Sequence, residues 1–244
     1  MRNRRDGKQV KMNGFDKFLY YLKPRRSDSE VYINREIDVT NLVNYMDKKK
    51  KENKNITYFH LFSTAIGKTF YNCPLLNRFI IRGRKYQRND VSISFVAKTQ
   101  FTDNASELLK VIKIKEKDNV NTISKKISGD VKKIRSNETS DADKFADLLG
   151  KLPRFIMAIG VWIVKRLDNH DLLPASLTSD SIYHSSVILS NLGSIHCGGI
   201  YHNLTNFGTS SFLATIGEIH KEKLLDENGK EYIADICDLR KSGN

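Results

Sequence analysis

Apolar and polar residues repeat along this chain with two different periods. Alternation of apolar and polar side chains, or a short apolar run between turn residues, predicts a strand. Strands are predicted at 31–37, 79–81, 91–97, 109–114, 187–189 and 212–216. Asn228 and Gly229 predict the turn of a further hairpin, with strands at 218–225 and 231–239.

Apolar residues spaced three and four apart predict the helices that lie between these strands. They are expected near 15–22, 40–54, 57–73, 120–134, 145–152 and 153–167. The last of them contains ten successive apolar residues, Phe155 to Val164. Because a membrane-spanning helix needs about 20 residues, we interpret this run as a buried helix with Trp162 in the core. An interfacial helix with basic flanks is the alternative.

Strands and helices interleave along the whole chain, and two antiparallel hairpins are predicted, one with its turn at Arg82-Gly83 and one with its turn at Asn228-Gly229. This order predicts one α/β domain, a two-layer sandwich with a mixed β-sheet and packed helices. Residues 1–14 are basic and polar, and we expect them to form a mobile arm. The core domain is therefore predicted to cover residues 15–244.

The chain is strongly basic, with 41 Lys and Arg against 28 Asp and Glu and a net charge of +13. Such a charge favours anionic partners, but the lysines are scattered and fall largely on predicted helix faces. We therefore expect a solvated basic surface, with neither nucleic acid nor membrane as a partner. One cluster surrounds the hairpin at 78–88, which is either a phosphate-binding site or a solvated turn. Its members are Arg78, Arg82, Arg84, Lys85 and Arg88.

The cysteines and histidines provide little evidence for a metal or a disulfide. Cys73, Cys197 and Cys237 are odd in number and form no Cys-x-x-Cys pair, which argues against a disulfide framework and a structural zinc site. A reducing cytoplasm is the expected location. His196 and Cys197 are adjacent, but no third group that would orient a catalytic pair is evident. No secretory signal is recognisable at the N-terminus.

The most informative stretch is SSVILSNLGSIHCGGIYHNLTNFGTSSFLATIG, residues 185–217. Two apolar strands flank a loop that is rich in serine, asparagine and glycine. Rigid strands that present polar groups at a loop are a common architecture for functional sites.

This stretch resembles a known superfamily. SNLGS followed by NFGTSSFLATIGEI, together with INREIDVTNL and ITYFHLFSTAIGKTFYNCPLLNRFI, is similar to the coenzyme A-dependent acyltransferases. That superfamily includes the catalytic domain of 2-oxo acid dehydrogenase acyltransferases and chloramphenicol acetyltransferase. The resemblance implies a chloramphenicol acetyltransferase-like fold, coenzyme A or acyl-coenzyme A as substrate, no metal, and a homotrimer. No lipoyl-bearing segment is recognisable, and we expect a stand-alone protein.

The resemblance also implies which groups perform the chemistry. In the superfamily the base is the histidine of a His-x-x-x-Asp-Gly motif, and a hydroxyl group near the strand end holds the oxyanion. Here the candidates for the oxyanion site or substrate channel are Ser186, Ser190 and Asn191, while Ile188 occupies the position of the family's hydroxyl residue. None of the six histidines is followed four residues later by aspartate.

Two functional hypotheses follow from this pattern. The first is an acyltransferase domain that ends before its base motif and is catalytically inactive, because losing the base and the oxyanion donor together lowers the rate by about five orders of magnitude. The second is a non-catalytic protein of the same fold that binds coenzyme A or serves in assembly. A basic nucleic-acid-binding protein is a third possibility, but no recognised binding motif is present.

Overall fold

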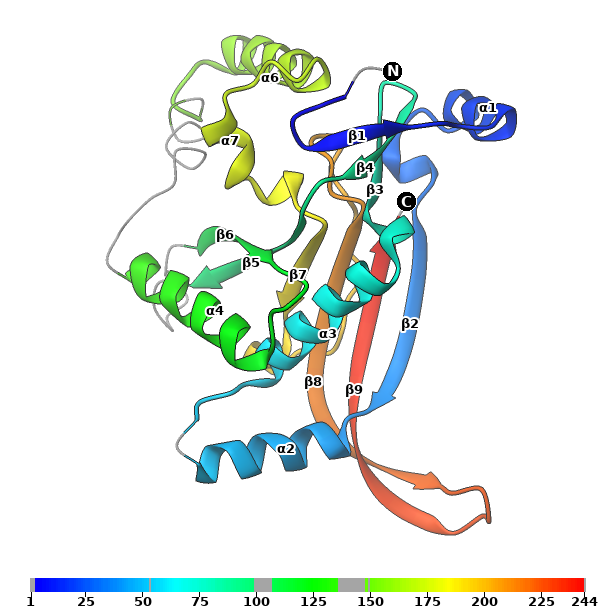
Figure 1. Ribbon diagram of the computed structural model, residues 1–244, viewed down its shortest axis with the longest axis vertical. Helices are drawn as coiled ribbons and strands as arrows, with labels where there is room; N and C mark the ends of the chain where they lie inside the picture. The colour runs from blue at the N-terminus through cyan, green and yellow to red at the C-terminus, as the bar shows by residue number, and fades with distance from the viewer. Residues whose placement is uncertain (1–2, 53, 99–106, 136–147, 149, 244) are drawn as a thin grey trace.

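A computed structural model describes residues 3–52, 54–98, 107–135, 148 and 150–243. The strands form two sheets, a six-stranded sheet of order β2-β9-β8-β7-β5-β6 and a three-stranded sheet of order β1-β4-β3 (Figure 1). The strands are β1 Gly7–Val10, β2 Val31–Asp38, β3 Arg78–Ile81, β4 Arg84–Arg88, β5 Val91–Lys98, β6 Glu107–Ile114, β7 Val187–Asn191, β8 Phe212–Leu225 and β9 Glu231–Gly243. The helices are α1 Gly14–Leu22, α2 Thr40–Lys51, α3 Tyr58–Asn72, α4 Val120–Arg135, α6 Arg154–Asn169 and α7 Ala175–Ser179.

The large sheet is mixed, as the sequence predicted. β7 runs parallel to both β5 and β8, with Val187 opposite Phe212 and Asn191 opposite Ile216. Neighbouring strands elsewhere in this sheet are antiparallel. The two apolar strands of the 185–217 stretch therefore lie side by side near the centre of the sheet.

The main core lies between this sheet and the helices α3 and α4. Ile93, Leu189 and Ile216 are fully buried there, packed with aromatic side chains of α3. α3 comes very close to the sheet at Gly67, where a Cβ atom would stand 2.9 Å from the side chain of Ile114. α3 and α4 thus form the helical layer of the predicted sandwich (Figure 1).

Part of the predicted mobile arm is held against the fold. β1 pairs with β4 over four residues, from Gly7 opposite Arg88 to Val10 opposite Lys85. Arg4 is buried and donates to the backbone oxygen of Asp168 at 2.7 Å. The sequence could not predict these contacts, because the partners of this short strand lie more than 70 residues away along the chain.

The prediction of a buried helix around Phe155–Val164 is half correct. The helix is present as α6, but most of its large apolar side chains face outward, and Trp162 is 65% exposed. Hydrophobic periodicity predicts that a helix forms, but burial of its apolar face requires another surface to pack against it. The described residues of this chain provide no such surface for the outer face of α6. The predicted helix at 145–152 falls largely outside them.

Candidate functional site

The end of β7 is shaped by a close approach of two backbones. The amide of Leu192 donates to the carbonyl of Ile216 at 2.9 Å, which continues the pairing of β7 with β8 for one residue. A Cβ atom at Gly193 would stand 2.8 Å from the carbonyl oxygen of Gly217 and 2.9 Å from the Tyr58 hydroxyl. Only glycine fits there, so the SNLG turn is fixed in place beside β8.

The three candidate residues of the sequence analysis are not in one place. Ser186 is buried just before β7, where its hydroxyl accepts a hydrogen bond from the amide of Ser92 at 3.0 Å. Ser190 and Asn191 are half-buried at the other end of the strand. The buried Oδ1 of Asn191 has no hydrogen-bond partner among the described residues. Ser190 and Asn191 are therefore the two candidates that lie together at the strand end.

A histidine–carboxylate pair lies just beyond this turn. Nδ1 of His196 is 2.6 Å from Oε1 of Glu218, and both side chains are accessible to solvent. His196 has a φ of 54°, a left-handed conformation that is uncommon for residues other than glycine. The pairing of β8 with β9 shifts register between Ile216 and Ile219, which places Glu218 at the irregularity.

Sequence reasoning missed Glu218 as the group that orients His196. The two residues are separated by 22 positions and meet only because a turn and a register shift coincide. Neither irregularity has a clear sequence signal, since bulges depend on the pairing of a strand with its neighbour.

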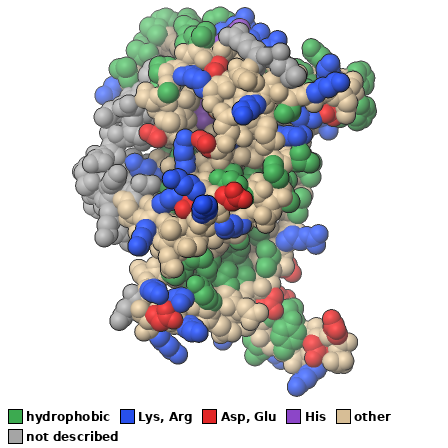
Figure 2. Space-filling model, in the orientation of Figure 1, with side chains coloured by type: hydrophobic (Ala, Val, Ile, Leu, Met, Phe, Trp, Pro, Cys, Tyr) green, Lys and Arg blue, Asp and Glu red, His purple; other side chains and the backbone are tan. Residues whose placement is uncertain are grey.

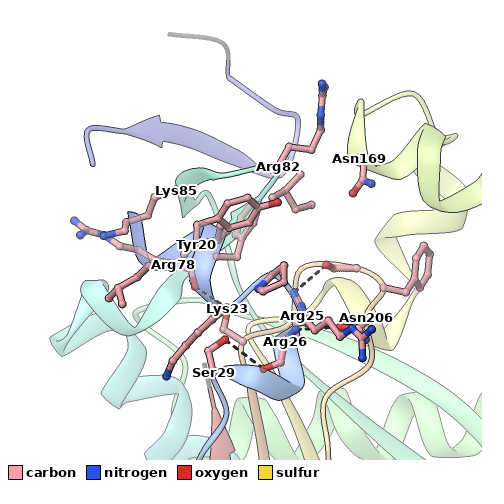
Figure 3. A pocket seen from close by; sticks show the side chains of 18 of the residues that line it. Tyr20, Lys23, Arg25, Arg26, Ser29, Arg78, Arg82, Lys85, Asn169 and Asn206 are labelled. Atoms are coloured by element: carbon pink, nitrogen blue, oxygen red, sulfur yellow. Dashed lines mark hydrogen bonds between the residues drawn. The ribbon is translucent and has the colours of Figure 1, made fainter. Parts of the chain in front are cut away.

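A large pocket lies at the opposite end of β7, near the start of β8. Its volume is about 840 Å³, and α1, the β3–β4 hairpin, the end of α6 and the 206–212 segment line it (Figure 3). Seven cationic residues belong to the lining: Lys23, Arg25, Arg26, Arg78, Arg82, Lys85 and Lys165. The two carboxylates of the lining already have partners. Asp16 pairs with Lys85, and Asp168 pairs with Arg4 and His184.

The cations of the pocket differ in how firmly they are held. Arg26 donates to the carbonyl oxygens of Ser210 at 2.7 Å and Gly208 at 2.9 Å, and burial lowers its pKa. Lys23 and Lys165 are exposed and form no ion pair with any carboxylate of the described residues. The pocket therefore carries excess positive charge and suits an anionic ligand.

The basic residues that the sequence analysis grouped around the hairpin at 78–88 lie in different environments in the structure. Arg78, Arg82 and Lys85 line the pocket, whereas Arg84 lies outside its lining. The phosphate-binding alternative therefore fits the first three residues. Arg84 serves as a matched residue on the same hairpin.

Arg88 has a structural role. Its guanidinium is buried and donates to the carbonyl oxygens of His184 at 2.6 Å and Thr209 at 2.7 Å. It also lies over the ring of Phe79 at 4.7 Å. Burial lowers the pKa of Arg88 to about 10. These contacts tie the hairpin to the loop before β8 and leave Arg88 unavailable to a ligand.

Among the residues that the structure describes, no three His, Cys, Asp or Glu side chains gather into a group that could hold a metal ion. The cysteines Cys73, Cys197 and Cys237 are free. Burial raises the pKa of the Cys237 thiol to about 11, which makes it a poor nucleophile.

Comparison with solved structures defines the class of the fold. The chain is similar to a probable dihydrolipoamide acetyltransferase from Listeria monocytogenes 4b F2365, with a TM-score of 0.60 and 18% identity over 97% of this chain and 85% of that one. It is also similar to a chloramphenicol acetyltransferase, with a TM-score of 0.53 and 10% identity over 97% of this chain and 89% of that one. The fold is thus of the chloramphenicol acetyltransferase type.

Sequence comparison narrows this class. Residues 23–145 match the family described as 2-oxoacid dehydrogenases acyltransferase (catalytic domain). The lipoamide acyltransferase component of the branched-chain alpha-keto acid dehydrogenase complex of Bacillus subtilis (strain 168) is 29% identical over 127 residues. That match covers 49% of this chain but only 29% of the Bacillus protein. The chain belongs to the 2-oxoacid dehydrogenase acyltransferase family.

Proposed function

We propose that this protein binds coenzyme A or an acyl-coenzyme A through the basic pocket, as an acyltransferase-type domain of its family. The cationic pocket is the observation that carries the proposal. Its volume of about 840 Å³ lies within the usual range for ligand sites. Coenzyme A carries a pyrophosphate and a 3′-phosphate, which are the kind of groups that lysine and arginine bind.

The chemistry of acyl transfer places further demands on the site. A base must take the proton from the attacking group, and a hydrogen-bond donor must stabilise the oxyanion of the tetrahedral intermediate. Ser190 and Asn191 at the end of β7 are our candidates for the second role. Ile216 opposite Asn191 is four residues from Phe212 in the pocket lining, about 13 Å along β8. That separation suits a ligand with a long, flexible arm.

The residue that would accept the proton is the one requirement for which the sequence offers no candidate from the family motif. None of the six histidines is followed four residues later by aspartate, so these residues contain no equivalent of the family's His-x-x-x-Asp-Gly base. We infer that these 244 residues alone transfer acyl groups about five orders of magnitude more slowly than a complete site. The alternative within the same fold is a coenzyme A-binding or assembly protein that performs no catalysis.

Calorimetry with coenzyme A tests the proposal directly. Arg82→Glu reverses a charge in the pocket lining, and Arg84→Glu reverses one outside it. We expect Arg82→Glu to weaken binding at least about tenfold, from the loss of one charge-assisted hydrogen bond and added repulsion. Arg84→Glu should change affinity less than about twofold. Absence of binding by the unmodified chain, or equal losses in both variants, would refute the site.

An acetyl-coenzyme A thiol-release assay then separates the two forms of the proposal. Binding with no release above the uncatalysed background supports a non-catalytic role. Measurable but slow release supports an incomplete acyltransferase. Fast release, at ordinary enzyme rates, would show that the chain contains a competent base near the end of β7.

We also propose a homotrimer in the cytoplasm. β2 forms one edge of the large sheet, and Val31, Tyr32 and Ile33 on it are exposed. An exposed apolar edge strand is a natural site of self-association. Sedimentation equilibrium should give three times the chain mass, and Ile33→Lys should lower it. The free cysteines support a reducing compartment.

A further inference from the structure

The outer face of α6 is apolar where a surface helix is normally polar. Phe155 is 68% exposed, Trp162 65% and Ile159 56%. Apart from buried Asp168, a narrow stripe at helical spacing turns inward: half-buried Met157, Gly160, Val164 and Leu167. The helix therefore presents its larger hydrophobic side chains to its surroundings and uses its smaller face for packing.

The last turn of α6 is firmly anchored, so this orientation is fixed. Asp168 is buried, and its Oδ1 lies 3.0 Å from Nε2 of His184 and 3.4 Å from Nη2 of Arg4. The backbone oxygen of Asp168 also accepts from Arg4. Rotating α6 to bury Trp162 would break these buried contacts, which makes such a rotation costly.

A second helix at the same end has the same character. On α1, Phe15 is 67% exposed and Tyr21 77% exposed, while Asp16 and Tyr20 face the β3–β4 hairpin. Both helices line the basic pocket, so they belong to one end of the molecule (Figure 1). Figure 2 shows hydrophobic side chains over both helices, with lysine and arginine side chains nearby.

Exposed cations surround these apolar faces. Seven of them are Lys17, Lys23, Arg25, Lys151, Arg154, Lys165 and Arg166. None of the seven forms an ion pair with a carboxylate of the described residues. The end of the molecule formed by α1 and α6 thus combines large hydrophobic side chains with positive charge that the chain itself does not neutralise.

We propose that this α1–α6 end docks on the surface of an anionic lipid bilayer. Aromatic and aliphatic side chains on one face of a helix, with lysine and arginine at its margins, are the features of an interfacial helix. α6 has 16 residues and is about 24 Å long, so it would lie along the surface. Consistent with that, no helix in the described parts of the chain is long and apolar enough to cross a membrane. This inference reverses the sequence-based expectation that no membrane is involved.

Other occupants fit the charges or the side chains less well. A second copy docked through the same end would bring like charges together, which is unfavourable. A nucleic acid would satisfy the cations, but Ile156, Ile159 and Ile163 would gain nothing from phosphate groups. An anionic bilayer accepts both kinds of side chain, because the hydrophobic ones enter its interface and the cations meet its negative surface. Each cation near that surface strengthens binding roughly fivefold.

Vesicle flotation without coenzyme A tests the inference independently of the proposed function. The probes are vesicles of phosphatidylcholine alone and vesicles with about one-third phosphatidylglycerol. Trp162 is the only tryptophan of the chain, so its fluorescence reports on α6 alone. We expect binding to the anionic vesicles with a blue shift of the emission, and at least tenfold weaker binding to the neutral ones.

Matched variants locate the contact. Ile159→Asp on α6 should weaken vesicle binding roughly tenfold or more, because it removes one inserted hydrophobic side chain. Ile233→Asp changes a side chain that is 64% exposed on β9, in the hairpin at the far end (Figure 1), and should have no effect. Lys165→Glu should weaken binding, and Lys230→Glu near the same far turn should not.

Three results would overturn the inference. One is no binding to anionic vesicles at low salt by a chain that is folded by circular dichroism. Another is equal binding by Ile159→Asp and Ile233→Asp. The third is a Trp162 emission that is already blue-shifted without lipid in a self-associated form, which would assign this face to a second copy.

Discussion

α3 and α6 are both apolar helices, of 15 and 16 residues, and the hydrophobic spacing predicted both of them. The structure gives them opposite environments. α3 buries Phe62 and Phe70 against the large sheet, whereas Asp168 is the one buried residue of α6. Hydrophobic periodicity therefore decides that a helix forms, while the surface that covers the helix must come from elsewhere in the fold or from a partner.

Local features of the two helices explain part of the difference. α3 has small residues on its inner face, and Gly67 lets Ile114 of β6 approach the helix backbone closely. It also begins with a capping box, in which Thr57 accepts from the amide of His60 and His60 accepts from that of Thr57. α6 begins at Arg154, and its N-cap residue Pro153 makes no side-chain capping hydrogen bond. α3 fits closely onto a sheet, and α6 does not.

The largest effect is expected in the core. Phe70 is 5% exposed and meets the ring of Phe212 edge-on, with 5.7 Å between centroids. Phe70→Ala should lower the free energy of unfolding by about 3–5 kcal/mol, because it removes buried hydrophobic surface and leaves a cavity. Urea denaturation measures this. A loss below about 1 kcal/mol would show that α3 is not packed on the sheet as described.

A smaller loss of stability is expected from a change at Asp168, which anchors the last turn of α6. Burial would raise the pKa of Asp168, but the hydrogen bond and charge of His184 and the charge of Arg4 outweigh it, so the pKa lies below its ordinary value of 3.8. The carboxylate therefore stabilises the fold above that pH, and this stabilisation is lost as the pH falls through the folded pKa. Asp168→Asn should cost about 2–3 kcal/mol near pH 7.

Acid titration of unfolding supplies the control for this prediction. The loss of stability below pH about 4 should be shallower in Asp168→Asn than in the unmodified chain, because one titrating group has been removed. Identical acid profiles for the unmodified chain and Asp168→Asn would contradict the buried network.

The sequence was most informative about regular elements and least informative about the site. The strands at 187–189 and 212–216 were predicted, and so was the mixed sheet, since their apolar runs have few other interpretations. The basic pocket was foreseen only as a cluster on one hairpin, because Lys23, directly after α1, and Lys165 on α6 join it from positions far apart in the sequence. The His196–Glu218 pair depends on a register shift that no local pattern predicts.

A still smaller difference in the free energy of unfolding is expected between variants at the N-termini of the two helices. Thr57→Ala removes the side-chain acceptor for the His60 amide and should cost about 1 kcal/mol. Pro153→Ala at the start of α6 removes no side-chain hydrogen bond and should cost less than about 0.5 kcal/mol. Equal losses in the two variants would mean that capping does not distinguish α3 from α6.

The smallest effect is expected on the outer face of α6. Phe155→Ser and Trp162→Ser should each change the free energy of unfolding in lipid-free solution by less than about 0.5 kcal/mol, because both side chains are largely exposed. Phe155→Ser should nevertheless weaken binding to anionic vesicles. A loss of about 2 kcal/mol or more without lipid would place these side chains in a covered interface. It would thereby remove the contrast between α3 and α6, and with it the argument for a membrane-facing helix.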